Sequence, residues 1–442
     1  MRAVGDGPSL MSRLADHFPA LRSHNYRRYM VGQSASIAGT FLQSVALGWL
    51  VLQLTKDGSA VGLVIAAQFV PALALGAWAG SVADRFDARR AVLVLQVLLG
   101  VQATALAVLV LTDHAALWSL CLLAMVQGVG SAFDPPLRQS LMNETVGDTE
   151  IASAVATNAT MVQMGMILGP ALAAVIISTV GIGWCFAVNA VSYSVMFLAI
   201  KSIKPGLLVR RERVPGADTS VRAGLRYLRS RPDIRLLLLV LGVTSLVALR
   251  LEVILPVLAE RGLGGGAALY ALMTAVRGGG ALVAALYLAS RKGTPPVHLM
   301  RRGCACLALS LAAMATPNTA VAVVAMFPVG IGLLSAIVGT LSLTQVLASP
   351  EFRGRVVAVW FVVLNGGVVF GALLTGWIVE HLGTRAALLV GAASAAAAYA
   401  LLGRRAHLLD GTRPDLTEMS SDGNLVPRRV HNATAMEEGT TW

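Results

Sequence analysis

Three charged side chains lie within long apolar stretches of this 442-residue chain: Arg250, Glu252 and Arg277. A charge near the middle of a bilayer costs roughly 3 kcal/mol on insertion scales, so such residues pair with one another or face an internal cavity. Glu252 is then the carboxylate that could take up and release a proton, with Arg277 holding its charged form; a static ion pair is the alternative. Asp134, close to the end of another apolar run, is the reserve candidate for this chemistry.

Helix geometry allows Glu252 and Arg277 to meet if they lie on consecutive spans. The span that contains Glu252 ends near Glu260, which places Glu252 about 12 Å below one membrane face. Counted from the start of the next span, Arg277 lies about 15 Å below the same face. We also expect Pro256 to bend the first of these helices, and Arg250 to point to its opposite side and snorkel outward.

The elements that must position these residues follow from composition. Hydrophobic residues make up 56% of the chain and charged residues only 13%, whereas a soluble domain carries about 25% charged residues. A helix needs roughly 20 apolar residues to cross the hydrocarbon, and the longest uncharged runs divide at turn residues such as Gly181 and Pro317. The sequence therefore predicts an all-α integral membrane protein with twelve transmembrane helices in two pseudo-symmetric six-helix bundles.

The distribution of charge predicts how these spans are oriented. With the amino terminus inside, 30 of the 35 Lys and Arg residues lie on the cytoplasmic side, three lie on the other side and two lie within spans. Positive charge marks the cytoplasmic side, so both termini are expected there, at the cell membrane. The same distribution accounts for the net charge of +12 without nucleic-acid binding.

The predicted order along the chain is a cytoplasmic segment, a six-helix bundle, a cytoplasmic linker, a second six-helix bundle and a disordered cytoplasmic tail. These parts are residues 1–28, 29–200, 201–235, 236–403 and 404–442. The linker is expected to form an amphipathic helix around Val221–Leu228.

A glycine pattern suggests that the two bundles are duplicates. The first-half glycines recur 202 residues later, pairing Gly165, Gly169 and Gly181 with Gly367, Gly371 and Gly383. Duplicated halves around a site near the membrane midplane are common in secondary transporters. Within the first set, Gly165 and Gly169 lie four residues apart and would let two helices pack closely, and Pro170 would bend the helix. Ordinary tight packing is the alternative to a functional role.

Several motifs resemble the major facilitator superfamily, and within it the siderophore and macrolide exporters. The most specific is Gly80-x-x-Ala83-Asp84-Arg85 followed by Arg89 and Arg90, which resembles the loop between helices 2 and 3 of that superfamily. The others, found in the expected order, are Asn25–Ser34, Ala132–Arg138, Gly165–Pro170 and Pro350–Val356. The resemblance covers roughly residues 22–403 and implies export of an amphipathic small molecule, driven by inward proton flow.

The resemblance also implies residue roles. Asp84 would sit at the start of helix 11, near Gly354, when the cytoplasmic gate is shut, because a helix amino terminus attracts a carboxylate. The other gate residues would be Gly80, Arg85, Arg89 and Arg90, although the arginines could instead only fix the topology. Spans 1, 4, 7 and 10 would line the cavity, which makes Gln43 and Gln127 candidates for substrate contact; interhelical hydrogen bonds are the alternative. The family default is a monomer.

Two other functions stay open at this point. The chain could catalyse uptake or facilitated diffusion of a metabolite, or act as a transport-inactive sensor, since Ala124 stands where exporters often carry an Arg, four residues before Gly128. No catalytic constellation, metal-ligand spacing or phosphate loop is present in the sequence, so we expect no enzyme activity, cofactor or metal. The expected partners are a small-molecule substrate, protons and the lipid bilayer.

Overall fold

The computed structural model describes residues 19–209, 226–290, 296–349 and 352–405, together with the pairs 418–419 and 425–426. Within its helices, the side chains of residues 77, 80–85, 148, 152, 289 and 296 are not described. The first half of the described chain consists of six long helices and short 3-10 turns. The long helices are α2 (His24–Thr55), α3 (Gly58–Arg85), α4 (Ala88–Leu111), α5 (Leu117–Thr145), α6 (Ile151–Thr179) and α7 (Gly183–Lys201), and the turns are η1 (Pro19–Arg22), η2 (Asp148–Glu150) and η3 (Pro205–Leu207).

The second half is built in the same way except that its first span is interrupted. That span consists of α9 (Pro232–Leu246), α10 (Leu251–Val257) and a π-helical turn, η4 (Leu258–Gly262). The remaining helices are α11 (Gly266–Ser290), α12 (Pro296–Met314), α13 (Thr319–Leu347) and α14 (Arg353–Arg404). In the tail, β1 (Glu418–Met419) pairs antiparallel with β2 (Leu425–Val426); the rest of the segment expected to be disordered lies outside the described residues.

Eleven helical segments in the described chain are long and apolar enough to cross a membrane. The last of them, α14, has 52 residues, so it would run about 78 Å as one straight helix, more than twice the roughly 30 Å of hydrocarbon. Gly383, with φ 85°, interrupts it. Counting the two parts of α14 separately gives twelve crossings, which confirms the predicted fold class.

The glycine repeat coincides with equivalent structural positions in the two halves. Gly181 and Gly383, the matched turn glycines, both have positive φ, at 99° and 85°. An added Cβ at Gly169 would collide with the backbone of α2, and one at Gly371 would collide with Leu246 of α9. The fifth span therefore packs on the first in one half, as the eleventh packs on the seventh in the other, which supports the inferred duplication.

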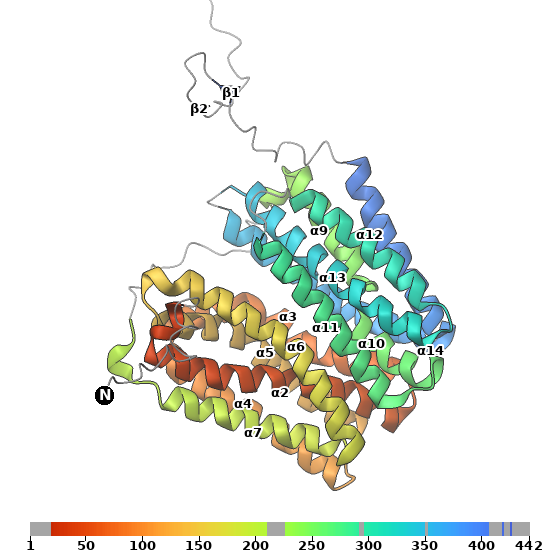
Figure 1. The fold of residues 1–442 in the computed structure, drawn as a ribbon, viewed down its shortest axis with the longest axis horizontal. Coiled ribbons are helices and arrows are strands. Elements are labelled where there is room, and N and C mark those ends of the chain that lie inside the picture. Colours follow the sequence, from red (N-terminus) through yellow and green to blue (C-terminus); the bar gives the residue numbers. More distant parts are fainter. Residues whose placement is uncertain are drawn as a thin grey trace, which may run out of the picture.

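The two halves meet at one end of the molecule and diverge at the other (Figure 1). Helices α3 and α14, and α6 and α11, pack across the interface. The largest buried apolar cluster joins both halves, with Leu50 and Val51 from α2 and Ile254 and Leu258 from the seventh span. Other buried clusters belong to one half alone. We call the joined end, which carries Lys56, the closed end, and the opposite one the open end.

The linker re-enters the fold at the open end of the second half. Its amphipathic helix, expected around Val221–Leu228, falls mostly outside the described residues, but Leu228 is buried against Ile234 and Val356. The Tyr227 hydroxyl accepts hydrogen bonds from Ser349 N (3.2 Å) and the Arg231 guanidinium (2.8 Å). Partial burial favours the neutral phenol, but these donors hold the pKa of Tyr227 below its usual value.

Candidate functional site

The seventh span is broken in its middle, and the break positions the charged residues. Helix α9 ends at Leu246, residues 247–250 are not helical, and α10 starts at Leu251. The sequence analysis placed the bend at Pro256. The break in the helix instead comes earlier, at residues 247–250, and corrects that prediction. Its physical basis is contact with α14: Gly371 lets α14 approach the Leu246 backbone, and the Thr375 hydroxyl donates to the Leu246 carbonyl at 3.4 Å.

The structure brings Glu252 and Arg277 together, as the depth argument predicted. Arg277 Nη1 lies 3.1 Å from Glu252 Oε1. The Arg277 side chain is 11% exposed, whereas that of Glu252 is 46% exposed. All the other residues of α10 are buried, and α10 contacts α2, α3, α11 and α14. Glu252 is therefore the one exposed side chain of a short helix that packs against helices of both halves.

Arg250 is buried instead of snorkelling outward. Its side chain is only 7% exposed. The expectation that Arg250 snorkels outward is therefore wrong: the non-helical backbone before α10 (φ −96°, ψ 37° at Arg250) breaks the helical phase on which it rested. Of the two buried arginines, Arg277 is the one that pairs with Glu252.

A second buried ion pair lies within the first half. Arg138 Nε is 2.6 Å from Asp134 Oδ1, one helical turn away on α5, and its guanidinium also donates to Ser36 Oγ (3.0 Å) and to Gln33 Oε1. A cavity of about 430 Å³ opens beside the pair, lined also by Tyr29. Helix α5 continues to Thr145, and Arg138 is buried within it.

The two amides expected to line the cavity are buried inside the first half. Gln43 is 0% exposed and Gln127 is 3% exposed. Gln43 donates to the side-chain oxygens of Gln127 (3.1 Å) and Gln102 (3.3 Å), and it accepts from Asn189 at 2.8 Å. In this conformation both amides therefore form hydrogen bonds between helices, which was the alternative to substrate contact.

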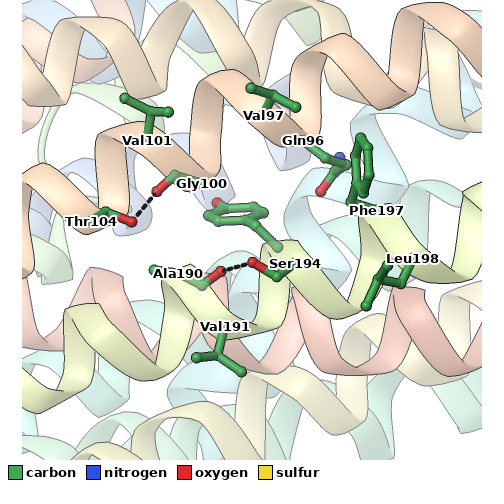
Figure 2. Close-up of a pocket in the computed structure, with 11 residues that line it drawn as sticks. Gln96, Val97, Gly100, Val101, Thr104, Ala190, Val191, Ser194, Phe197 and Leu198 are labelled. Carbon is green, nitrogen blue, oxygen red and sulfur yellow. Dashed lines mark hydrogen bonds between the residues drawn. The ribbon is translucent and has the colours of Figure 1, made fainter.

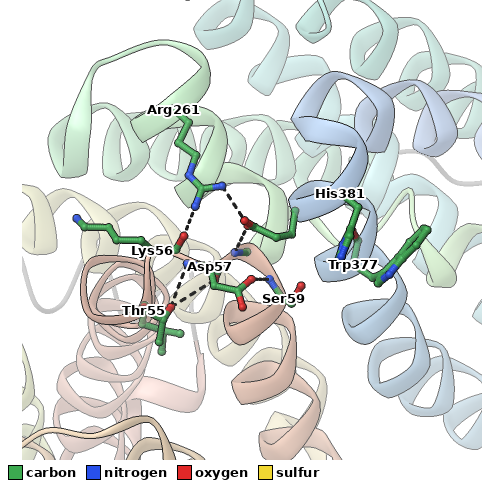
Figure 3. Close-up of polar contacts among 10 residues, drawn as sticks. Thr55, Lys56, Asp57, Ser59, Arg261, Trp377 and His381 are labelled. Carbon is green, nitrogen blue, oxygen red and sulfur yellow. Dashed lines mark hydrogen bonds and ion pairs between the residues drawn. The ribbon is translucent and has the colours of Figure 1, made fainter.

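The closed end is held by a polar network between the halves, which the sequence did not reveal (Figure 3). Glu380 Oε2, on α14, accepts from the backbone N–H of Gly58 at 2.8 Å and from Arg261 Nη1 at 3.0 Å. Arg261 also donates to the Lys56 carbonyl. The α2–α3 turn of the first half is thereby tied to η4 and to α14 of the second half.

The expected gate residues lie at the open end. Gly80, Asp84 and Arg85 fall in the last turns of α3, among the side chains that are not described. Arg89 donates from Nη2 to the Lys201 carbonyl (2.9 Å) and from Nε to Ile200 (3.2 Å), so it caps the end of α7 within its own half. The backbone N–H of Arg90 donates to the Asp87 side chain at 3.0 Å. Among the described residues, nothing lies within 4 Å of a Cβ added at Gly354.

The glycines of the predicted packing motif bring α6 close to α2. Gly165 lies against Ile37 and Phe41 of α2, and Gly169 against Phe41; Pro170 lies inside α6.

A pocket of about 550 Å³ lies between α4 and α7 (Figure 2), where the buried Gln96 amide has no hydrogen-bond partner in the described structure. Among the residues described, no three His, Cys, Asp or Glu side chains gather in a way that could hold a metal ion.

Twelve crossings in two matched halves, around a broken helix with a buried charge cluster, define a multi-pass membrane protein of the major facilitator class. The chain belongs to the family described as transmembrane secretion effector, whose profile matches residues 15–438. This family is one of transporters of small molecules, not of enzymes, and the match confirms the resemblance seen in the sequence.

Individual proteins that resemble this chain share only about a quarter of their residues with it over the matched segments. The staphyloferrin A transporter of Staphylococcus aureus is 25% identical over 164 residues, which is 36% of this chain and 41% of that protein. The multidrug efflux pump Tap of Mycobacterium tuberculosis is 27% identical over 370 residues, or 80% of this chain and 86% of that one. The chain spans about half the length of the first relatives that it matches.

Solved structures show the same fold at low sequence identity. The nucleoside transporter NupG superposes with a TM-score of 0.66 at 13% identity, covering 87% of this chain and 99% of its own. The peptide transporter PepTSo gives 0.70 at 12% identity, covering 88% and 99%. These similarities concern the fold alone.

Proposed function

We propose that this protein exports an amphipathic small molecule across the cell membrane in exchange for protons. The observation that carries the proposal is the Arg277–Glu252 ion pair at 3.1 Å, on a broken span whose helix α10 contacts both halves. Discontinuous helices form the substrate and ion sites of many secondary transporters. Two relatives, a staphyloferrin A transporter and a multidrug efflux pump, agree with such a cargo.

In the proposed cycle, Glu252 changes its partner when it changes its charge. Ionised Glu252 holds Arg277, and protonation removes the carboxylate charge and frees the guanidinium. A released guanidinium in a low-dielectric site is costly, and substrate binding re-forms the pair and releases the proton. The proton and the substrate therefore bind alternately, as exchange requires. Asp134, paired with Arg138 in the first half, is the second carboxylate available for this role.

The two ends would alternate as gates. We propose that the closed end faces outward and the open end faces the cytoplasm, with both termini there, because most Lys and Arg residues outside the spans belong to that end. Glu380 and Arg261 would hold the outer gate in this state. When the inner gate shuts, Asp84 would approach the start of α14 near Gly354, while the outer contacts separate. The protein would work as a monomer.

Transport in everted membrane vesicles tests this proposal. Vesicles containing the protein would be screened against a panel of lipophilic drugs and siderophores under an inwardly acidic pH gradient. The proposal expects accumulation of at least one compound, with proton release from the lumen as it enters. Accumulation only with the reversed gradient would indicate uptake instead. Saturable binding without flux would indicate a sensor, and either outcome would overturn proton-coupled export.

A further inference from the structure

Four arginines gather at the open end of the second half, where α12 begins and α14 ends. Arg301 and Arg302 lie near the start of α12, Arg404 is the last residue of α14, and Arg405 caps that helix. The two helices pack against each other. A Cβ added at Gly403 would lie 3.7 Å from the guanidinium carbon of Arg301. Two helices therefore bring this arginine cluster together.

Arg301 is held in place within the cluster, but its charge is not neutralised there. Its Nη2 donates to the Tyr399 hydroxyl at 3.0 Å, and its guanidinium carbon lies 4.7 Å from the centre of the Tyr399 ring. Its Nε is buried and has no hydrogen-bond partner among the described residues. Within the described part of the chain, the ion pairs of the protein include none of the four arginines. The ring thus orients a guanidinium whose charge no described carboxylate balances.

The cluster borders the surface that faces the lipid. Helix α12 packs on α13 and α14 of its own half and lies at the edge away from the first half (Figure 1). Arg302 and Leu309 are two helical turns apart and share one face of α12, and Leu309 is 73% exposed. Tyr399 is also exposed, and tyrosine is enriched where a membrane meets water. The arginines therefore lie where lipid headgroups begin.

We infer that Arg301, Arg302 and Arg404 form a binding site for the phosphate headgroup of an anionic phospholipid in the leaflet at the open end. A guanidinium group binds phosphate oxygens through two parallel hydrogen bonds. Basic pockets between transmembrane helices bind the headgroups of lipids such as cardiolipin. The bound lipid would bridge α12 and the end of α14. The site is separate from the proposed proton coupling and does not depend on the direction of transport.

Lipid binding to the full-length protein tests the site. The protein in detergent would be titrated with cardiolipin or with zwitterionic phosphatidylcholine, and native mass spectrometry would give the affinity for the first lipid bound. We expect wild type to bind cardiolipin at least about tenfold more tightly than phosphatidylcholine. The double variant Arg301→Gln with Arg302→Gln should lose about fivefold in cardiolipin affinity for each arginine removed. The matched control, Arg226→Gln with Arg229→Gln, removes two exposed linker arginines at the same end and should keep the wild-type affinity.

A single variant keeps the test decisive if the double variant fails to fold. Arg404→Gln changes an exposed residue at the end of α14 and should weaken cardiolipin binding about fivefold without lowering the melting temperature of the lipid-free protein. Equal affinities of wild type for the two lipids would overturn the site. Equal losses in the cluster and linker variants would also overturn it, because they would indicate general attraction to positive charge.

Discussion

Glu380 accepts a hydrogen bond from the backbone N–H of Gly58 at 2.8 Å, so a carboxylate at the end of the eleventh span binds the start of the second. The amino terminus of a helix carries about half a positive charge, which favours this contact. The motif at Asp84 implies the inverse arrangement at the open end, where a carboxylate ending the second span would meet the start of the eleventh. Under the proposed mechanism each gate would have one such carboxylate contact, or latch. At the closed end Arg261 also binds Glu380.

Removing the latch at the closed end should shift the protein toward the outward-open state. We expect Glu380→Ala to raise the rate at which a membrane-impermeant maleimide labels Val51→Cys, a position buried at that end. The contacts are partly exposed and worth about 1 kcal/mol, so the increase should be a few-fold. Glu260→Ala, at an exposed acid nearby, is the matched control and should leave labelling unchanged. Equal labelling in all three backgrounds would mean that Glu380 holds no gate.

The Asp134–Arg138 pair should matter for stability mainly because each charge neutralises the other. Asp134→Asn leaves Arg138 uncompensated and should lower the free energy of unfolding by about 3 kcal/mol or more, seen as a lower melting temperature in detergent. The double variant Asp134→Leu with Arg138→Leu should recover much of that loss, since no buried charge then stays unpaired. The single variants Asp134→Leu and Arg138→Leu would be measured beside the double variant. If the double variant loses as much stability as the two single variants added together, the residues act independently.

Two neighbouring glycines on α14 should respond differently to the same change. A Cβ at Gly371 collides with the Leu246 backbone, whereas a Cβ at Gly366 meets nothing within 4 Å among the described residues. Gly371→Ala should therefore cost about 1–3 kcal/mol through overpacking, and Gly366→Ala should be neutral or slightly stabilising because alanine favours helix. Melting temperatures of the two variants measure this difference. The same tolerance at both positions would contradict the close approach that supports the helix break.

The sequence predicted those features of the fold that depend on local composition. Uncharged runs of helical length gave the crossings, and Gly181 and Gly383 marked turns because each adopts a positive φ. The Glu252–Arg277 contact was predictable because both residues lie at similar depth on consecutive spans. Here the cost of an unpaired charge in the membrane left few alternatives.

Features that depend on distant elements were not predictable. The break at residues 247–250 relies on Gly371 and Thr375 of α14, which nothing in the local sequence reveals. The pairing of Arg138 with Asp134 was not predicted, although their spacing of four residues was a local signal for it. The sequence could not decide between the two roles of Gln43, because a span that is apolar all round does not disclose which side faces a neighbour.

The central claim is that Glu252 carries the proton that drives transport. The direct measurement compares wild type with Glu252→Gln in proteoliposomes, for pH-driven accumulation and for exchange of labelled against unlabelled substrate at constant pH. A permanently neutral side chain should abolish accumulation and preserve exchange, because substrate still binds and the halves still alternate. Glu252→Asp, which keeps the carboxylate, should retain part of the accumulation. Accumulation by Glu252→Gln at the wild-type rate and with the wild-type pH dependence would contradict the mechanism.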